Sequence, residues 1–238
     1  MNDTQLFTTY FKNPKEELHN FYIKELLPTW FEYNSKYLEY DYDVWVYTNV
    51  PDEIPFKCNI CYKQESKAKL DLDSNIMSTQ IGCWYDFIND KLHEQQVGIY
   101  LDPDAFMFNN KLIEYSKQVK DYCMTKKKNP HFHSDAGISI FRNTPLTRKY
   151  IDKIIEEYKK TPWIKSIAEE THTDLHQGDN NFYIGWSDVN ILLRGMLCGK
   201  SIDIDCVHGS IKQDILKDTK IKDLMIKKDE LRFRDRTY

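Results

Sequence analysis

Short apolar runs alternate along the chain with longer amphipathic segments. Five runs have the β-branched and aromatic content of strands: Gln5–Phe11, Asp43–Val50, a weaker one at Phe56–Lys63, Val97–Leu101 and Ala136–Phe141. In the segments between them, apolar residues recur at helical spacing. This alternation is typical of βαβ units, so the pattern predicts an α/β fold with a mainly parallel sheet flanked by helices.

Four amphipathic segments before residue 160 are predicted to be helices. The first opens at Pro14, and Pro28 is expected to kink or end it. The second follows a possible N-cap at Ser78, the third starts at about Asn110, and the fourth starts at Thr144-Pro145. Their predicted inward residues are Leu18, Phe21, Tyr22 and Leu26 in the first; Ile81, Trp84, Tyr85, Ile88 and Leu92 in the second; Leu112, Tyr115, Val119 and Tyr122 in the third; Tyr150, Ile151, Ile154, Ile155 and Tyr158 in the fourth.

The tail from about Lys217 is dense in charges of both signs, which is typical of a solvated helix packed on a surface. We therefore expect one domain over residues 1–215 and a charged helical extension over residues 216–238. With 238 residues and 41% hydrophobic content, the chain is long enough to bury one sizeable core.

Charge and segment length narrow the class of partner. A net charge of −4 does not favour nucleic acid, so a small molecule is the expected partner. Met1 opens no charged-then-apolar leader and no apolar run approaches the ~18 residues of a membrane span. These features predict a soluble cytoplasmic protein without a membrane span, and they leave its oligomeric state open.

The six cysteines are expected to be thiols in a reducing compartment. Cys58 and Cys61 form a C-x-x-C pair inside a strand-like run, but no second pair follows at zinc-finger spacing. A structural zinc site is the less favoured alternative.

The run Val97–Leu101 ends in Asp102-Pro103-Asp104, two carboxylates one residue apart. Ligands of open parallel sheets collect beyond the carboxyl ends of the strands, and Pro103 stiffens the turn that carries the carboxylates. Two hard oxygen donors held in this way suit Mg²⁺ or Mn²⁺. The alternative is an ordinary turn in which Asp102 caps the next element and Asp104 is solvated.

Three stretches resemble one family. IYLDPDAFMF resembles the DxD strand end of GT-A-fold glycosyltransferases, and Asp135–Ile154 is similar to the glycine turn, strand and helix near the sugar in these enzymes. Cys206–Lys212 resembles the H-x-G-x-x-K element of family 8 (glycogenin-like) and related retaining enzymes, although here Gly209 directly follows His208.

The resemblance implies a set of site residues. Asp102, Asp104 and His208 would hold a divalent ion on the donor pyrophosphate, and Lys212 would meet the phosphates. The imidazole favours Mn²⁺, with Mg²⁺ possible. Further donor-binding positions are Thr8, Thr9, Tyr10, Gly137 and Gly209, with ordinary strand residues and turn glycines as the alternatives.

The stretch HQGDNNF resembles a loop that borders the reacting carbon in the same enzymes. It aligns with either Gln177 or Asp179-Asn180 in the matching place. Asp179 is the first choice for a polar catalytic group, and a helix N-cap is its structural alternative.

Together these features predict a metal-dependent glycosyltransferase, for a hexose or a pentose, that uses a nucleotide-diphosphate sugar. The resemblance favours UDP over GDP as the carrier, retention of configuration, and a glycan or other hydroxyl acceptor. The alternatives are a non-catalytic nucleotide-sugar-binding module of the same fold and a sugar-phosphate nucleotidyltransferase. The latter is disfavoured because FTTYFKNPKEE has no glycine where such enzymes carry a glycine-rich loop.

Overall fold

The computed structural model describes residues 3–40, 43–63, 80–125, 135–160, 206–208 and 218–234. Its centre is a six-stranded sheet with the strand order β3-β2-β1-β4-β7-β6. The strands are β1 (Thr4–Tyr10), β2 (Val44–Thr48), β3 (Asn59–Tyr62), β4 (Val97–Leu101), β6 (Tyr122–Thr125) and β7 (Asp135–Arg142). β1 to β4 are parallel, and β7 and β6 add antiparallel pairs at one side. The predicted α/β fold with a mainly parallel sheet is confirmed.

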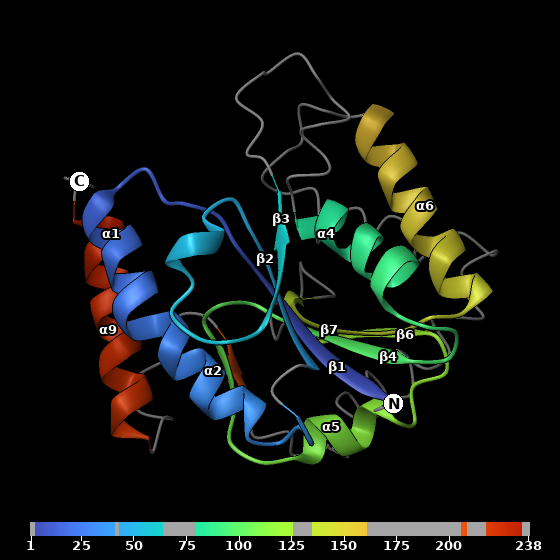
Figure 1. Cartoon of the computed structure of the whole chain (residues 1–238), viewed down its shortest axis with the longest axis horizontal. Coiled ribbons are helices and arrows are strands. Elements are labelled where there is room, and N and C mark those ends of the chain that lie inside the picture. The colour runs from blue at the N-terminus through green and yellow to red at the C-terminus, as the bar shows by residue number, and fades with distance from the viewer. Residues whose placement is uncertain are drawn as a thin grey trace, which may run out of the picture.

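Helices cover both faces of the sheet. The helical elements are α1 (Glu16–Phe21), η1 (Tyr22–Leu26), α2 (Leu27–Ser35), η3 (Pro51–Glu53), α4 (Gln80–Asp86), η4 (Phe87–Lys91), α5 (Lys111–Ser116), α6 (Pro145–Lys160) and α9 (Thr219–Phe233). α4 and α6 lie together on one side, and α9 lies beside α1 on the other (Figure 1).

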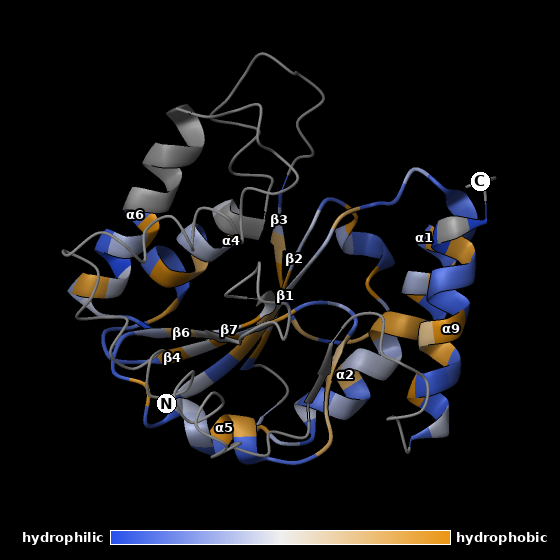
Figure 2. Ribbon diagram, turned by 180° about the vertical axis from the view of Figure 1, so that it is seen from behind, coloured by the Kyte–Doolittle hydropathy of each residue, from blue (hydrophilic) through white to orange (hydrophobic). Residues whose placement is uncertain are grey.

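The core lies along the central strands, which carry hydrophobic residues (Figure 2). Phe7 of β1 is fully buried and stacks on Phe87 of η4, with 4.0 Å between ring centroids. Trp84 of α4 packs against Tyr100 of β4 at 5.4 Å and is also fully buried. These large aromatic contacts fix α4 and η4 against β1 and β4.

Pro28 does not end the first helix, which was one of the two outcomes expected there. The five-residue π-helical segment η1 precedes it, and the Leu27 N–H bonds to the carbonyl of Tyr22. Pro28 then lies in the first turn of α2, where its missing N–H is tolerated. The helical path continues to Ser35.

The helix predicted from about Asn110 is shorter than its apolar spacing suggested, and Tyr122 belongs to β6 instead. α5 ends at Ser116, and the Arg142 side chain donates hydrogen bonds to backbone carbonyls beyond that end. Its Nε donates to the Val119 oxygen at 2.6 Å and its Nη2 to the Lys117 oxygen at 2.9 Å. The helical spacing of Tyr122 is therefore a coincidence that tertiary hydrogen bonds override.

A second, two-stranded sheet joins β5 (Ala105–Met107) to β8 (Cys206–His208) in antiparallel pairing. On the other edge of β5, the buried Asn34 side chain donates to the Ala105 oxygen at 3.0 Å and accepts from the Met107 N–H at 2.8 Å. The register places His208 opposite Ala105.

α9 packs beside α1 through a face that buries Ile221, Leu224 and Met225. A boundary at residue 216 stays a prediction, because residues 209–217 lie outside the described ranges. Within the part of the chain that the structure describes, no helix is both long and apolar enough to span a membrane.

Candidate functional site

The two aspartates lie on a tight turn at the carboxyl edge of the parallel strands. The Ala105 N–H bonds to the Asp102 oxygen at 2.9 Å, which closes a four-residue turn with Pro103 in its second position. Proline is favoured there because its fixed φ fits the turn. The Asp102 N–H donates to the Gly137 carbonyl at 2.8 Å, so the start of β7 lies directly beside the turn. Residues predicted separately at Asp102 and Gly137 are thus neighbours.

Tyr100 connects the turn to the end of β1. Its hydroxyl donates to Asp102 Oδ1 at 2.5 Å and lies 3.0 Å from Thr9 Oγ1. Thr9 is half-buried, whereas Thr8 is fully buried and its hydroxyl has no hydrogen-bond partner among the described residues. Of these two threonines, Thr9 is the one tied to the aspartyl turn.

Tyr10 is buried at the end of β1, where it belongs to a polar cluster that the sequence did not predict. A 2.6 Å hydrogen bond joins its hydroxyl to His19 Nδ1, and His19 Nε2 lies 2.8 Å from Glu53 Oε2. The hydrogen bond from His19 lowers the pKa of Glu53, and burial raises the pKa of Tyr10. This cluster fixes α1 and η3 against the carboxyl end of β1.

Tyr22 of η1 extends the site toward the aspartyl turn. Its ring stacks on Tyr10, with 5.3 Å between centroids. Burial raises the pKa of the Tyr22 hydroxyl, the negative charge of Asp104 raises it further, and the Arg232 guanidinium opposes that shift. β1, η1, the aspartyl turn and α9 therefore meet at one place.

Asp104 is paired with a side chain from the far end of the chain. Lys228 Nζ of α9 lies 2.5 Å from Asp104 Oδ2, and the Lys228 side chain is only 2% exposed. Lys228 was not among the predicted site residues, because the tail was expected to be a solvated helix on the surface. Its spacing in the sequence could have indicated burial, because Lys228 falls on the same helix face as Ile221, Leu224 and Met225.

The Lys228–Asp104 pair affects how the predicted divalent ion could bind at the aspartyl turn. Asp104 Oδ2 already contacts an ammonium and Asp102 Oδ1 already accepts from Tyr100. Within the described residues, no group of three or more His, Cys, Asp or Glu side chains is arranged to hold a metal. An ion shared by the two aspartates would therefore have to compete with the Lys228 ammonium at Asp104.

The remaining predicted residues are only partly placed. The backbone of His208 is described in β8, opposite Ala105 and thus one residue from Asp104, but its side chain lies outside the described part. The other predicted positions in the second half of the chain are also outside it: Gln177, Asp179, Asn180, Gly209 and Lys212. Their roles stay predictions.

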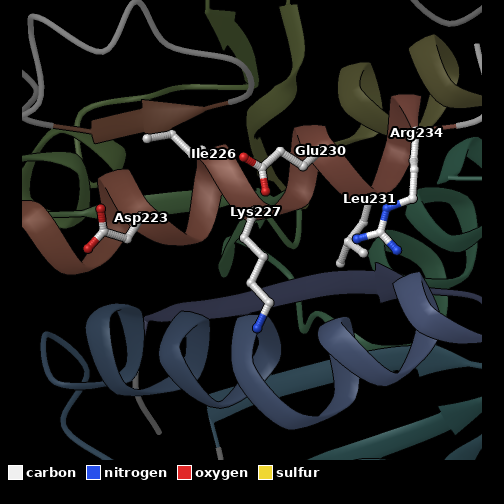
Figure 3. A pocket seen from close by; sticks show the side chains of 6 residues that line it. All are labelled: Asp223, Ile226, Lys227, Glu230, Leu231 and Arg234. Atoms are coloured by element: carbon white, nitrogen blue, oxygen red, sulfur yellow. The ribbon is translucent and has the colours of Figure 1, made fainter.

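A shallow groove of about 350 Å³ lies elsewhere on α9, and Lys228 is not among its lining residues (Figure 3). Lys227 and Arg234 point from it toward the α1 and η1 segment and pair there with Glu25 and Glu17. The groove does not include the aspartyl turn, so it does not bear on the site at the sheet edge. Its lining residues are Asp223, Ile226, Lys227, Glu230, Leu231 and Arg234.

Cys58, Cys61, Cys83 and Cys123 are free thiols. Burial raises the pKa of Cys58 to about 12 and also raises that of Cys61. Both thiols are therefore expected to be protonated at neutral pH.

No protein-family model matches this chain, and no curated protein matches it. Among solved structures, the glycosyltransferase GlyE of Streptococcus pneumoniae TIGR4 is similar with a TM-score of 0.50 and 12% identity, over 99% of this chain and 65% of that one. Its apo form gives 0.48 at 12% identity, over 100% and 65% of the two chains. A glycosyltransferase involved in glycosylation of the major capsid of PBCV-1 gives 0.46 at 10% identity, over 94% and 98%.

The first of these similarities defines the fold class. The sheet order, the antiparallel β7 and the turn after β4 belong to a single α/β domain with a GT-A-like arrangement. At 12% identity the similarity is one of fold, and this chain spans 65% of the length of the GlyE structure.

Proposed function

We propose that this chain is a glycosyltransferase that moves a sugar from a nucleotide-diphosphate sugar, with UDP as the carrier, to a hydroxyl of a glycan or another acceptor. The observation that supports it most is the aspartyl turn at the carboxyl edge of a GT-A-like sheet. Asp102 is bonded there to both β1, through Tyr100, and β7, through Gly137. Ligands of such sheets collect at this edge.

In this proposal the nucleotide lies over the end of β1, beside Thr9 and Tyr10. The buried Tyr10 is held by His19, and the half-buried Tyr22 stacks on it, so Tyr10 would support the Tyr22 ring beside the donor. Gly137 carries no side chain between the Asp102 backbone and the donor sugar. Thr8 belongs to the same predicted set but is fully buried.

The transfer step breaks the bond between the anomeric carbon and the β-phosphate oxygen and forms a bond from that carbon to the acceptor oxygen. The acceptor proton passes to the departing phosphate oxygen, and the configuration is retained. Lys212 and Gly209 are proposed to meet the developing negative charge on the phosphate. Asp179, with Gln177 or Asn180, is proposed to lie beside the reacting carbon.

The predicted Mn²⁺, with Mg²⁺ as its alternative, stays a prediction for the set Asp102, Asp104 and His208. An ion bound there would neutralise the diphosphate. Because Asp104 is paired with Lys228, no step of the proposed reaction is assigned to an ion.

Two other functions fit the same fold. A nucleotidyltransferase is disfavoured because the segment after β1 has no glycine to cradle a triphosphate. A binding module without chemistry would hold the donor and leave it intact, so it differs from the proposed enzyme in a single measurable respect.

The proposed enzyme releases sugar from its donor, and a binding module does not. Incubation with a panel of UDP- and GDP-sugars, in EDTA and in Mn²⁺, is expected to release free sugar slowly from one donor, since water can replace the acceptor. Asp102→Asn should reduce the rate by about 10²-fold or more. Asp90→Asn, which removes an exposed carboxylate ahead of β4, is the matched control and should leave it unchanged. A donor that binds without any turnover would favour the binding module.

A further inference from the structure

The inward face of α9 carries one charged residue among apolar ones. Ile221, Leu224 and Met225 are buried on this face, and Lys228 continues it with 1% of its surface exposed. A buried ammonium is costly unless a nearby anion pairs with it. The position of Lys228 therefore requires a partner inside the molecule.

That partner is Asp104. Lys228 Nζ lies 2.5 Å from Asp104 Oδ2 and 3.8 Å from Asp229 Oδ1. The Asp104 side chain is itself 15% exposed, so solvent screens the pair weakly. The contact joins residues that are 124 positions apart in sequence.

The helix that carries Lys228 is fixed along its length. Asp218 caps its first turn by accepting from the Ile221 N–H at 3.1 Å, and the Tyr33 hydroxyl donates to the same carboxylate at 2.7 Å. Three further ion pairs hold α9 to the first helical segments: Lys220 with Glu32, Lys227 with Glu25, and Arg234 with Glu17. The ammonium therefore reaches Asp104 from a helix that is capped at its start and packed beside α1.

The pair determines which cation the turn can take. A divalent ion on Asp104 would lie close to a buried ammonium, and two positive charges repel strongly where water is excluded. Neutralising one of two carboxylates also reduces the repulsion between the turn and an anionic diphosphate.

We propose that Lys228 is the resident cation of the aspartyl turn: it neutralises Asp104, and the wild-type chain therefore takes up no divalent ion there. Lys228 acts as a positioning residue, because its buried ammonium contacts Asp104 and not the donor. The part that concerns the donor rests on the function proposed above. The part that concerns the ion does not.

The test is direct titration of Mn²⁺, followed by the electron paramagnetic resonance signal of the free ion, without any nucleotide. Wild-type protein and Lys227→Met should bind Mn²⁺ weakly, at about millimolar concentrations or above. Lys228→Met should bind one ion at least about tenfold more tightly, because an ammonium no longer opposes it. Lys227→Met is the matched control, because it removes the same charge from the neighbouring, exposed position.

The double variant Lys228→Met/Asp104→Asn should lose the new site, which would assign it to the turn. Equal Mn²⁺ affinity in wild type and Lys228→Met would overturn the proposal. Tight Mn²⁺ binding by the wild type that is lost in the double variant would also overturn the proposal. This second comparison does not need Lys228→Met to fold. A parallel thermal-shift titration with UDP in EDTA separates the two proposals: a chain that never binds UDP contradicts the proposed function, while the Mn²⁺ titration still decides the role of Lys228.

Discussion

Tyr100 shows how a single residue joins the core to the candidate site. Its ring packs between Phe7, at 5.2 Å, and Trp84, at 5.4 Å, and its hydroxyl reaches Asp102 and Thr9. An aromatic residue with a polar tip can serve both environments at once. The orientation of the Asp102 carboxylate is therefore set by the core.

Replacing Tyr100 by Phe keeps the ring and removes only this link. We expect the free energy of unfolding to fall by about 1.5 kcal/mol, because a hydrogen bond to a carboxylate is lost while the packing stays. Affinity for UDP, measured by calorimetry, should fall several-fold. Thr9→Val removes one contact of the same hydroxyl and should give a smaller loss in both measurements; a larger loss would contradict the role given to Tyr100.

Glu53 makes the stability of the fold depend on pH. Its pKa lies below the ordinary value of 4.5 in the folded state, first because of the hydrogen bond from His19. A lowered carboxyl pKa stabilises the fold above the unfolded pKa, and that stabilisation is lost as the pH falls through the folded pKa.

Wild type should therefore be more stable than Glu53→Gln near neutral pH, and the difference should shrink as the pH falls below 4.5. Urea unfolding at several pH values measures it. Glu94→Gln, at an exposed position, is the control. A difference that stays constant down to strongly acidic pH would argue against the His19–Glu53 contact.

The elements show where pattern reasoning succeeds. The long strands and their helices follow from period and composition, because burial of one face dominates their energetics. β5 and β6 were missed because three or four residues carry too little periodicity. Of the kink or end expected at Pro28, the end does not occur, because the π-helical segment before it leads directly into α2.

Gly98 illustrates how closely β4 packs against η4. A Cβ atom at Gly98 would lie 2.5 Å from Phe87 Cε1 and 3.1 Å from Leu92 Cδ1. The Phe87 ring is fully buried and stacked on Phe7, so it has no space to move away.

Gly98→Ala is therefore expected to lower the free energy of unfolding by about 1–3 kcal/mol through overpacking. Urea unfolding of Gly98→Ala, Phe87→Leu and the double variant tests the cause. The two changes should be less destabilising together than the sum of each alone, since the smaller Leu makes room for the methyl group. Simple additivity would exclude the clash as the reason.

At the scale of the whole molecule, the aspartyl turn, the end of β1 and the start of β7 come together at one edge of the sheet. Parallel strands deliver their carboxyl ends to one edge, so Asp102 could be placed there from sequence. Gly137 lies at the start of β7 and reaches the same edge because β7 runs antiparallel to β4, which the pattern of apolar runs did not predict. The Lys228–Asp104 contact could not be predicted from sequence, because it depends on how α9 folds back onto the domain. A charged residue in a charged segment gives no sign of burial except its position on one helix face.

The central claim is that a nucleotide-diphosphate sugar is bound and cleaved at the aspartyl turn. The most direct measurement is the release of free sugar from UDP-sugars by purified wild-type protein and by Asp102→Asn, followed by chromatography. Wild type is expected to release sugar slowly from one donor, and Asp102→Asn is expected to release it about 10²-fold more slowly, with both proteins equally folded. Release at the same rate by both proteins, or by neither, would contradict it.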